Sequence, residues 1–163
     1  MRPRSGSQAI TSWIVASQKP HSWVPGCRSV VTGTPRAAAR ASVADDPDVA
    51  SRLTWEHRDL TAWEPPASAF DLVSAQYVHL PADQLTALLA GLGRAVAPGG
   101  TLLVVGHDPT DTHAHRAPLL QSAAQLAARL DAREWEILVS EARPRTTDGR
   151  IDAVLRARRR TSG

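Results

Sequence analysis

One short apolar run, Thr101–Val105, constrains the fold more than any other part of this 163-residue sequence. Four successive apolar residues follow the threonine without polar alternation, which is the pattern of a strand covered on both faces in a parallel sheet. Residues 98–100 (Pro-Gly-Gly) precede the run and residues 106–109 (Gly-His-Asp-Pro) follow it, so turn-forming residues bound it on both sides. The run therefore predicts an inner strand of an α/β sheet.

Strands and helices are predicted to alternate around this run. The other predicted strands are Leu53–His57, Phe70–Ala75, Trp135–Val139 and Ile151–Ala157. One helix is expected after Pro81, with its apolar residues on a single stripe at Leu85, Leu88, Leu89, Leu92 and Val96. A second helix is expected to begin at Pro118. Because Asp148-Gly149 leaves only a short turn between the last two strands, these strands should form an antiparallel hairpin that closes the sheet.

The first quarter of the chain differs in composition from the rest. Residues 1–41 contain six basic residues and no acidic residue, and the first acidic residue is Asp45. Two short apolar runs, Trp13–Ala16 and Val30–Val31, are the strand candidates in this part. We therefore expect residues 1–40 to be an atypical, poorly ordered segment and residues 41–160 to form an incomplete α/β domain.

Composition excludes several classes of protein. The single cysteine, Cys27, excludes an intramolecular disulfide framework and a cysteine-rich zinc site. No apolar run approaches the roughly 18 residues that a membrane-spanning helix needs. The sequence shows no signal peptide with a charged start and a long apolar stretch. We therefore expect a cytoplasmic protein with no membrane partner.

Three stretches of sequence belong to one pattern: residues 55–60 (WEHRDL), 70–81 (FDLVSAQYVHLP) and 92–106 (LGRAVAPGGTLLVVG). Together they resemble the class I S-adenosylmethionine-dependent methyltransferases, and within these the small bacterial methyltransferase-domain proteins. The resemblance covers roughly residues 40–160. It implies a Rossmann-like α/β fold: a mostly parallel sheet in the order 3-2-1-4-5-7-6, with helices on both faces and a C-terminal antiparallel hairpin. The N-terminal part of this chain is expected to be irregular.

The resemblance also implies methyl transfer from S-adenosylmethionine to a small-molecule acceptor. The family uses an acidic residue after strand 3 to accept a hydrogen bond from adenine. Asp59 stands at that position here, and Leu60 would flank the adenine ring. The residues leaving strand 4, which are Ala75, Gln76 and Tyr77, would lie beside the methionine half of the cofactor. For Asp59 the alternative is a residue that caps a turn.

A methyltransferase site can also require a general base. The cofactor carries the reactivity, so the protein mainly aligns the reactants and excludes water. A base assists when the acceptor carries a proton. His79, His107 and Asp108 follow predicted strands and are the candidates for this base. The alternative for each is a solvated or structural loop residue.

Two elements of the family pattern are missing from this sequence. The family has a glycine-rich loop after strand 1, where the lack of Cβ atoms lets the backbone approach the cofactor, and none of the ten glycines lies in such a pattern. The acidic residue that holds the ribose after strand 2 is also missing, since no acidic residue precedes Asp45. Trp13–Ala16 and Val30–Val31 are the candidates for strands 1 and 2. We expect residues 1 to about 36 to derive from a shifted reading frame or a misassigned start.

Two other function classes stay open. The chain could be a non-catalytic or truncated remnant of the methyltransferase fold that binds the cofactor weakly or not at all. The arginines at 156 and 158–160, with the basic N-terminal segment, are the features of a nucleic-acid-binding tail. Nucleic acid is not the expected partner, because the rest of the chain is net acidic and lacks a set of aromatic residues for stacking. A metal site among residues 107–115 is not expected either, because their histidines lack helical spacing.

Overall fold

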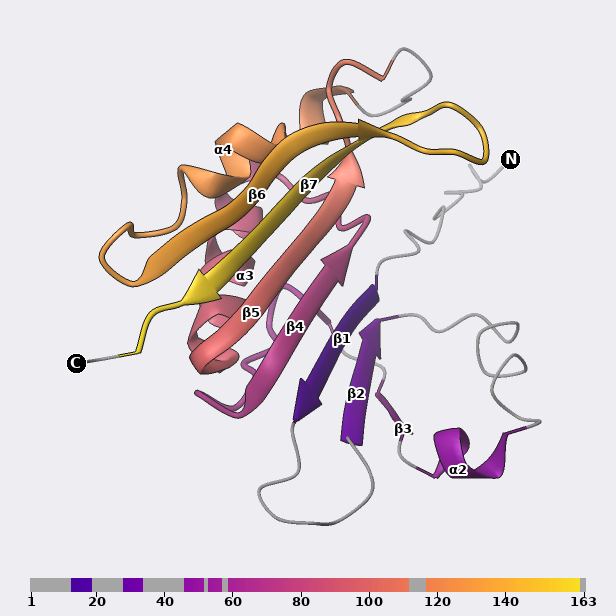
Figure 1. Cartoon of the computed structure of the whole chain (residues 1–163), viewed down its shortest axis with the longest axis vertical. Helices are drawn as coiled ribbons and strands as arrows, with labels where there is room; N and C mark the ends of the chain where they lie inside the picture. Colours follow the sequence, from indigo (N-terminus) through magenta and orange to yellow (C-terminus); the bar gives the residue numbers. More distant parts are fainter. Residues whose placement is uncertain are drawn as a thin grey trace, which may run out of the picture.

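The computed structural model describes residues 13–18, 28–33, 46–51, 53–56, 59–111 and 117–161. The elements, in chain order, are β1 (Trp13–Gln18), β2 (Arg28–Gly33), α2 (Pro47–Ala50), β3 (Leu53–Glu56), β4 (Phe70–Gln76), α3 (Ala82–Ala95), β5 (Val96–His107), the 3-10 helix η1 (Ala117–Leu119), α4 (Ala123–Ala127), β6 (Trp135–Pro144) and β7 (Ile151–Arg159). Seven strands form one sheet in the order β3-β2-β1-β4-β5-β7-β6 (Figure 1). The predicted α/β class, strand order and terminal hairpin are confirmed.

The direction of β1 is the main departure from the expected sheet. β1 and β2 include the two apolar runs predicted as strand candidates, and they occupy the slots of strands 1 and 2. However, β1 pairs antiparallel with both of its neighbours, β2 and β4, whereas β2 pairs parallel with β3 and β4 pairs parallel with β5. The arrows in Figure 1 show β1 pointing against the strands on either side of it. The sheet is therefore mixed, with β1 and β7 reversed relative to the other five strands.

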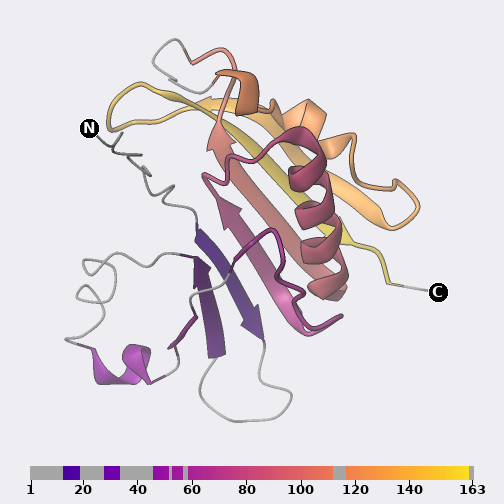
Figure 2. The same ribbon diagram turned by 180° about the vertical axis from the view of Figure 1, so that it is seen from behind.

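The two longer helices lie on the same face of the sheet. Figure 2 shows α3 crossing β4 and β5 and α4 lying beside β6 and β7 on that face. Over the opposite face the described residues place no helix, although the resemblance implied helices there. Within the part of the chain that the structure describes, no helix combines the length and the apolar character that a bilayer crossing requires.

The core lies between α3 and the sheet. The four leucines of the predicted stripe are buried on α3, and they pack with the buried residues Val73, Leu102 and Leu155 of three adjacent strands. Val96, the last residue of the predicted stripe, is buried at the start of β5 instead. These strand residues lie on one face because side chains alternate along a strand. The alternation predicted for β7 is confirmed, since Ala153, Leu155 and Ala157 are buried.

Two predicted boundaries shift for local reasons. α3 ends at Ala95 and passes directly into β5, so the Pro-Gly-Gly at 98–100 lies within the strand rather than before its first residue. Gly99 has a φ of +79°, and a Cβ on Gly100 would lie 2.8 Å from Val96 Cγ1, so both positions require glycine. The second α-helix begins at Ala123 rather than at Pro118, which lies in η1.

A capping box explains the later start of α4. The Gln125 backbone N–H donates to Ser122 Oγ at 3.2 Å, and the Ser122 backbone N–H donates to Gln125 Oε1 at 2.9 Å. This reciprocal pair satisfies two amides that the first turn of a helix would otherwise leave without partners. The capping chemistry of Ser122, rather than the fixed φ of Pro118, therefore determines where the helix begins.

The arginines at the end of β7 contribute to the fold. Arg159 Nη1 donates to the carbonyl oxygens of Val96 at 2.6 Å and Arg94 at 3.4 Å, and to Ser68 Oγ at 3.2 Å. These carbonyls lie at the C-terminal end of α3, where a positive charge is favourable. Arg160 Nε likewise donates to the carbonyl of Ala132 at 3.3 Å.

Replacing Arg159 with methionine is expected to lower the free energy of unfolding by about 1.5–3 kcal/mol, because it removes charged hydrogen bonds to backbone carbonyls. Arg158 is the matched control: its side chain is 52% exposed and lies 3.9 Å from Glu136, so Arg158→Met should cost about 0–1 kcal/mol. Urea denaturation of the two variants makes the comparison. Equal losses would contradict the structural role of Arg159.

Candidate functional site

Most of the predicted site residues lie along one edge of the sheet, which we call the carboxyl edge. β4 and β5 end there side by side, since Gln76 pairs with Val105. Trp13, the first residue of β1, pairs with Gln76 on the other side. β7 begins at the same edge, because Asp152 pairs with His107. In open α/β sheets ligands bind outside the carboxyl ends of the strands, so this edge is the candidate site.

Asp59 follows β3 and forms a turn with Thr61. Its Oδ1 accepts hydrogen bonds from the Thr61 backbone N–H at 2.9 Å and from Thr61 Oγ1 at 2.7 Å. These bonds hold the pKa of the Asp59 carboxyl below its ordinary value, so the group is ionised at neutral pH. Asp59 is exposed and, with Ala62, Trp63 and Glu64, lines an open hollow. Among the described residues no hydrogen bond engages Asp59 Oδ2, so one oxygen of the turn-forming carboxylate is available to a ligand.

The other residues predicted to contact the cofactor differ in exposure. Leu60 is half-buried and packs against the core cluster beneath α3. Ala75 is 2% exposed and belongs to that core. Gln76 is half-buried, and its Nε2 donates to Ser74 Oγ at 3.2 Å. The structure therefore puts Asp59, Gln76 and Tyr77 at the carboxyl edge and Ala75 in the protein interior.

Tyr77, the first residue after β4, has a strained backbone. Its φ is +53°, in the left-handed region, and its N–H donates to the Val105 carbonyl at 2.7 Å. A side chain other than glycine in this region costs about 1–3 kcal/mol, and such strain is concentrated at functional sites. The strained turn directs the chain from β4 along the end of β5.

Five polar residues gather at this end of β5, and we call them the edge cluster: Tyr77, His79, His107, Arg145 and Asp152. Tyr77 Oη donates to Asp152 Oδ2 at 2.9 Å, and Arg145 Nε lies 3.2 Å from the same oxygen. His107 Nδ1 lies 3.4 Å from Asp152 Oδ1. The ring of His107 is 4.9 Å from that of Tyr77 and stacks on that of His79 at 5.4 Å, measured between centroids.

A buried carboxylate is the centre of the edge cluster. The Asp152 side chain is only 6% exposed, and Arg145, which also pairs with Asp148 at 3.5 Å, supplies the compensating charge. Burial of the phenol, together with its hydrogen bond to Asp152, raises the pKa of Tyr77 above its ordinary value. Tyr77 therefore stays protonated at neutral pH and acts as a donor to Asp152.

Of this cluster, sequence reasoning identified Tyr77, His79 and His107 but missed Arg145 and Asp152. Asp152 lies in an alternating strand and Arg145 in a turn, and neither is part of a motif. The pairing of β5 with β7 brings Asp152 beside His107 across 45 residues of sequence. The only local signal was a charged residue between the apolar positions of β7.

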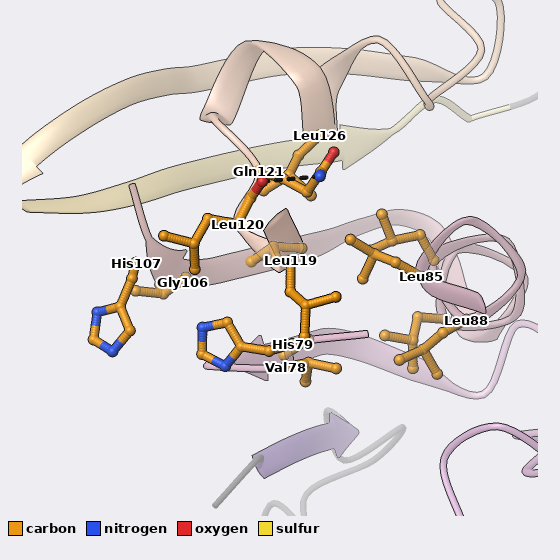
Figure 3. Close-up of a pocket in the computed structure, with 15 residues that line it drawn as sticks. Val78, His79, Leu85, Leu88, Gly106, His107, Leu119, Leu120, Gln121 and Leu126 are labelled. Atoms are coloured by element: carbon orange, nitrogen blue, oxygen red, sulfur yellow. Dashed lines mark hydrogen bonds between the residues drawn. The ribbon is translucent and has the colours of Figure 1, made fainter. Parts of the chain in front are cut away.

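A narrow apolar pocket opens next to the edge cluster. Leucines of α3, η1 and α4 line it together with β4 and β5, and His79 and His107 lie at one end (Figure 3). In Figure 3 the two imidazoles lie apart from Leu85 and Leu88, which face the opposite end. The enclosed space is about 20 Å³, room for a single water molecule. A substrate would therefore bind over the carboxyl edge rather than inside this pocket.

Asp108 has the environment of a structural residue. It is 3% exposed, and its Oδ1 accepts hydrogen bonds from the Thr110 backbone N–H at 2.9 Å and from Thr110 Oγ1 at 2.7 Å. Nearby, the buried Asp111 pairs with Arg150 Nε at 3.0 Å. These contacts favour the alternative that Asp108 shapes the loop after β5. His113 and His115 lie outside the described residues, among which no group of three His, Cys, Asp or Glu side chains is arranged to hold a metal ion.

The reversal of β1 affects which parts of the chain reach the candidate site. Gln18, the last residue of β1, pairs with Arg28, the first residue of β2, at the edge opposite the carboxyl edge. A parallel strand in this slot would instead end beside Gln76, where β1 begins with Trp13. β1 therefore ends, and β2 begins, at the edge away from the candidate site.

Comparisons with known proteins identify the fold. No family model matches the chain, and no curated protein sequence matches it. One similar solved structure is the 4+2 cyclase SpnF, with a TM-score of 0.60 and 18% identity over 82% of this chain and 65% of the cyclase. An S-adenosylmethionine-dependent methyltransferase from Mesorhizobium loti has a TM-score of 0.59 and 16% identity over 78% of each chain.

A third similar structure is the Burkholderia thailandensis 1,6-didemethyltoxoflavin-N1-methyltransferase, which was solved with 1,6-didemethyltoxoflavin and S-adenosylhomocysteine bound. Its TM-score is 0.57, and its identity is 17% over 80% of this chain and 60% of that chain. This chain thus spans less than two thirds of the length of the cyclase and of the Burkholderia enzyme. At these identities the likeness concerns the fold, and the chain has the fold of the S-adenosylmethionine-dependent methyltransferases.

Proposed function

We propose that this chain binds S-adenosylmethionine at the carboxyl edge and transfers the methyl group to a small-molecule acceptor. The observation that carries the proposal is a pair of polar sites on that edge, one after the outermost strand β3 and one after the central strand β4. Asp59 follows β3 and Tyr77 follows β4, and the sheet order separates these strands by three spacings, about 14 Å. This separation suits an extended ligand with adenine at one end and an amino acid at the other.

The described residues fit the two ends of such a ligand. The ionised Asp59 carboxylate has one oxygen available to accept a hydrogen bond from the adenine amino group. At the other end, Gln76 and the strained turn at Tyr77 lie beside the edge cluster. When bound, the cofactor would supply an electrophilic methyl group, while the residues of this chain bind it, orient the acceptor and take up its proton. The Burkholderia neighbour, with its bound small molecule, supports this class of acceptor.

A second candidate function is a methyltransferase fold that does not bind the cofactor. The reversed β1 favours it, because β1 ends and β2 begins at the edge of the sheet opposite the candidate site. No acidic residue precedes Asp45 to hold the ribose. Each lost hydrogen bond to a buried or charged group costs about 1–3 kcal/mol, so the loss of several would lower the affinity by orders of magnitude.

Calorimetric titration with S-adenosylhomocysteine separates the two candidates. We expect the wild-type chain to bind in the micromolar range. Asp59→Asn should weaken binding about ten-fold or more, because the amide can keep the turn with Thr61 but presents an N–H₂ group where the carboxylate accepts a hydrogen bond.

Glu136→Gln is the control for loss of a negative charge, since this exposed residue pairs with Arg158 away from the carboxyl edge. Its affinity should equal that of the wild type. If the folded wild-type chain shows no heat of binding at millimolar ligand, the proposed function is wrong and the second candidate stands.

A further inference from the structure

We propose that His107 and Asp152 form a proton-accepting pair, in which Asp152 holds the Nδ1–H of His107 and His107 Nε2 takes the proton of the methyl acceptor. His107 would then be the catalytic residue and Asp152 a positioning residue that acts through it. This inference rests on the proposed methyl transfer and deepens it by naming the group that receives the proton. Neither Asp152 nor its pairing with His107 follows from the sequence pattern.

The β5–β7 ladder brings the two side chains together. His107 and Asp152 are directly opposite each other in the antiparallel register, and opposite residues project from the same face of a sheet. Nδ1 of His107 lies 3.4 Å from Oδ1 of Asp152, and both atoms are buried without a hydrogen-bond partner among the described residues, while the His107 side chain as a whole remains 21% exposed. A bond between the two would satisfy both atoms. The imidazole therefore has one buried nitrogen next to the carboxylate and keeps contact with solvent at the carboxyl edge.

Two other residues hold the carboxylate in place. Tyr77 Oη and Arg145 Nε both approach Asp152 Oδ2, at 2.9 Å and 3.2 Å, so Oδ1 is left to face His107. A carboxylate fixed in this way sets both the orientation and the tautomer of an imidazole, because the nitrogen that bonds to the carboxylate keeps its proton. The other nitrogen, Nε2, is then the one that can accept a proton.

The charges around the imidazole support a transient positive charge on it. The groups that face His107 are the buried carboxylate of Asp152, the protonated phenol of Tyr77 and the stacked ring of His79. The charge of Arg145 is shared between Asp152 and Asp148. When His107 takes up a proton, the carboxylate of Asp152 is thus the nearest charge to it, and the attraction stabilises the imidazolium.

The proposed methyl transfer conserves protons and electrons. The acceptor heteroatom gives its proton to His107 Nε2 and uses its electron pair to bond the methyl carbon, while the electrons of the broken carbon–sulfur bond stay on sulfur. The imidazolium then releases its proton to solvent at the exposed edge. Asp108 is less suited to this role because it is buried and engaged by Thr110.

The tautomer of His107 tests the pair without cofactor or acceptor. In the full chain labelled with ¹⁵N-histidine, at a pH where the imidazole is neutral, we expect His107 to be mainly in the Nδ1–H form. Free histidine prefers the Nε2–H form, so this result would require a specific partner for Nδ1. His107→Gln removes the corresponding signals and thereby assigns them.

Asp152→Asn should move the tautomer population toward Nε2–H. Asp148→Asn is the matched control: it removes a carboxylate that also contacts Arg145 but is 44% exposed, and the Nδ1–H form should persist. A wild-type His107 found in the Nε2–H form would overturn the proposal, even if Asp152→Asn does not fold. An unchanged tautomer in folded Asp152→Asn would also overturn it.

The titration with S-adenosylhomocysteine tests the proposed function, and the tautomer measurement tests the pair, so each can be contradicted without the other. Absence of binding together with the Nδ1–H form removes the role in methyl transfer and leaves a structural pair. Binding together with the Nε2–H form leaves the proposed function standing and removes the pair.

Discussion

Replacing His107 with glutamine is expected to lower the turnover of methyl transfer by about 10²–10⁴-fold, the usual contribution of a general base. Glutamine has a polar side chain of similar reach, but its amide cannot take up a proton at neutral pH. The cofactor is proposed to lie between Asp59 and Tyr77, so the affinity for S-adenosylhomocysteine should not change. Release of S-adenosylhomocysteine measures turnover, with an acceptor found by screening small molecules that carry O–H or N–H groups.

The loss of turnover should depend on the pKa of the acceptor, and this makes the prediction specific to a general base. An acceptor that loses its proton to solvent needs no base, so the rate of the glutamine variant should rise as the pH approaches the pKa of the acceptor itself. Asp148→Asn, at the exposed turn beside the edge cluster, should keep the wild-type turnover. A glutamine variant with wild-type turnover would show that the acceptor proton goes elsewhere.

Local patterns were sufficient to predict much of the C-terminal part of the fold. The stripe of leucines in α3, the buried run in β5 and the alternation in β7 are each determined by residues that are near one another in sequence. The start of α4 was also readable, because Ser122 and Gln125 form the spacing of a capping box, but Pro118 was preferred as the start signal. That error came from ranking two local signals wrongly.

Pairing over long distances could not be predicted in the same way. The short apolar runs in β1 and β2 indicate strands, but such runs do not determine the direction of pairing, and the parallel β1 that the resemblance implied is wrong. The residues of the candidate site also divide into those that local sequence predicts and those that only long-range pairing brings together. His107 is recognisable because it follows a buried strand, whereas Asp152 and Arg145 become site residues only through the register of β7 against β5 and the turn that precedes β7.

The reversed β1 leads to an all-or-none prediction. With Cys27 replaced by serine, the double variant Trp13→Cys and Gln76→Cys is expected to form an intramolecular disulfide on mild oxidation. These two residues are directly paired, and opposite residues of antiparallel strands lie about 4.5–5.5 Å apart between Cα atoms, within the range that a disulfide spans. Loss of free thiols and a faster-migrating band under non-reducing conditions measure the crosslink.

The matched pair is Gln18→Cys with Gln76→Cys, which a parallel β1 would bring together. In the antiparallel register Gln18 lies at the far end of the strand, five residues from Trp13 and about 17 Å from Gln76, so this pair should stay reduced. Crosslinking of the second pair instead of the first would mean that β1 runs parallel to β4. The chain after Gln18 would then emerge at the carboxyl edge, where it could contact the middle of the cofactor, and the main structural argument for a non-binding fold would be lost. Crosslinking of the first pair alone leaves Asp59 and Tyr77, which follow β3 and β4 at that edge, as the contacts on which the affinity for the cofactor depends.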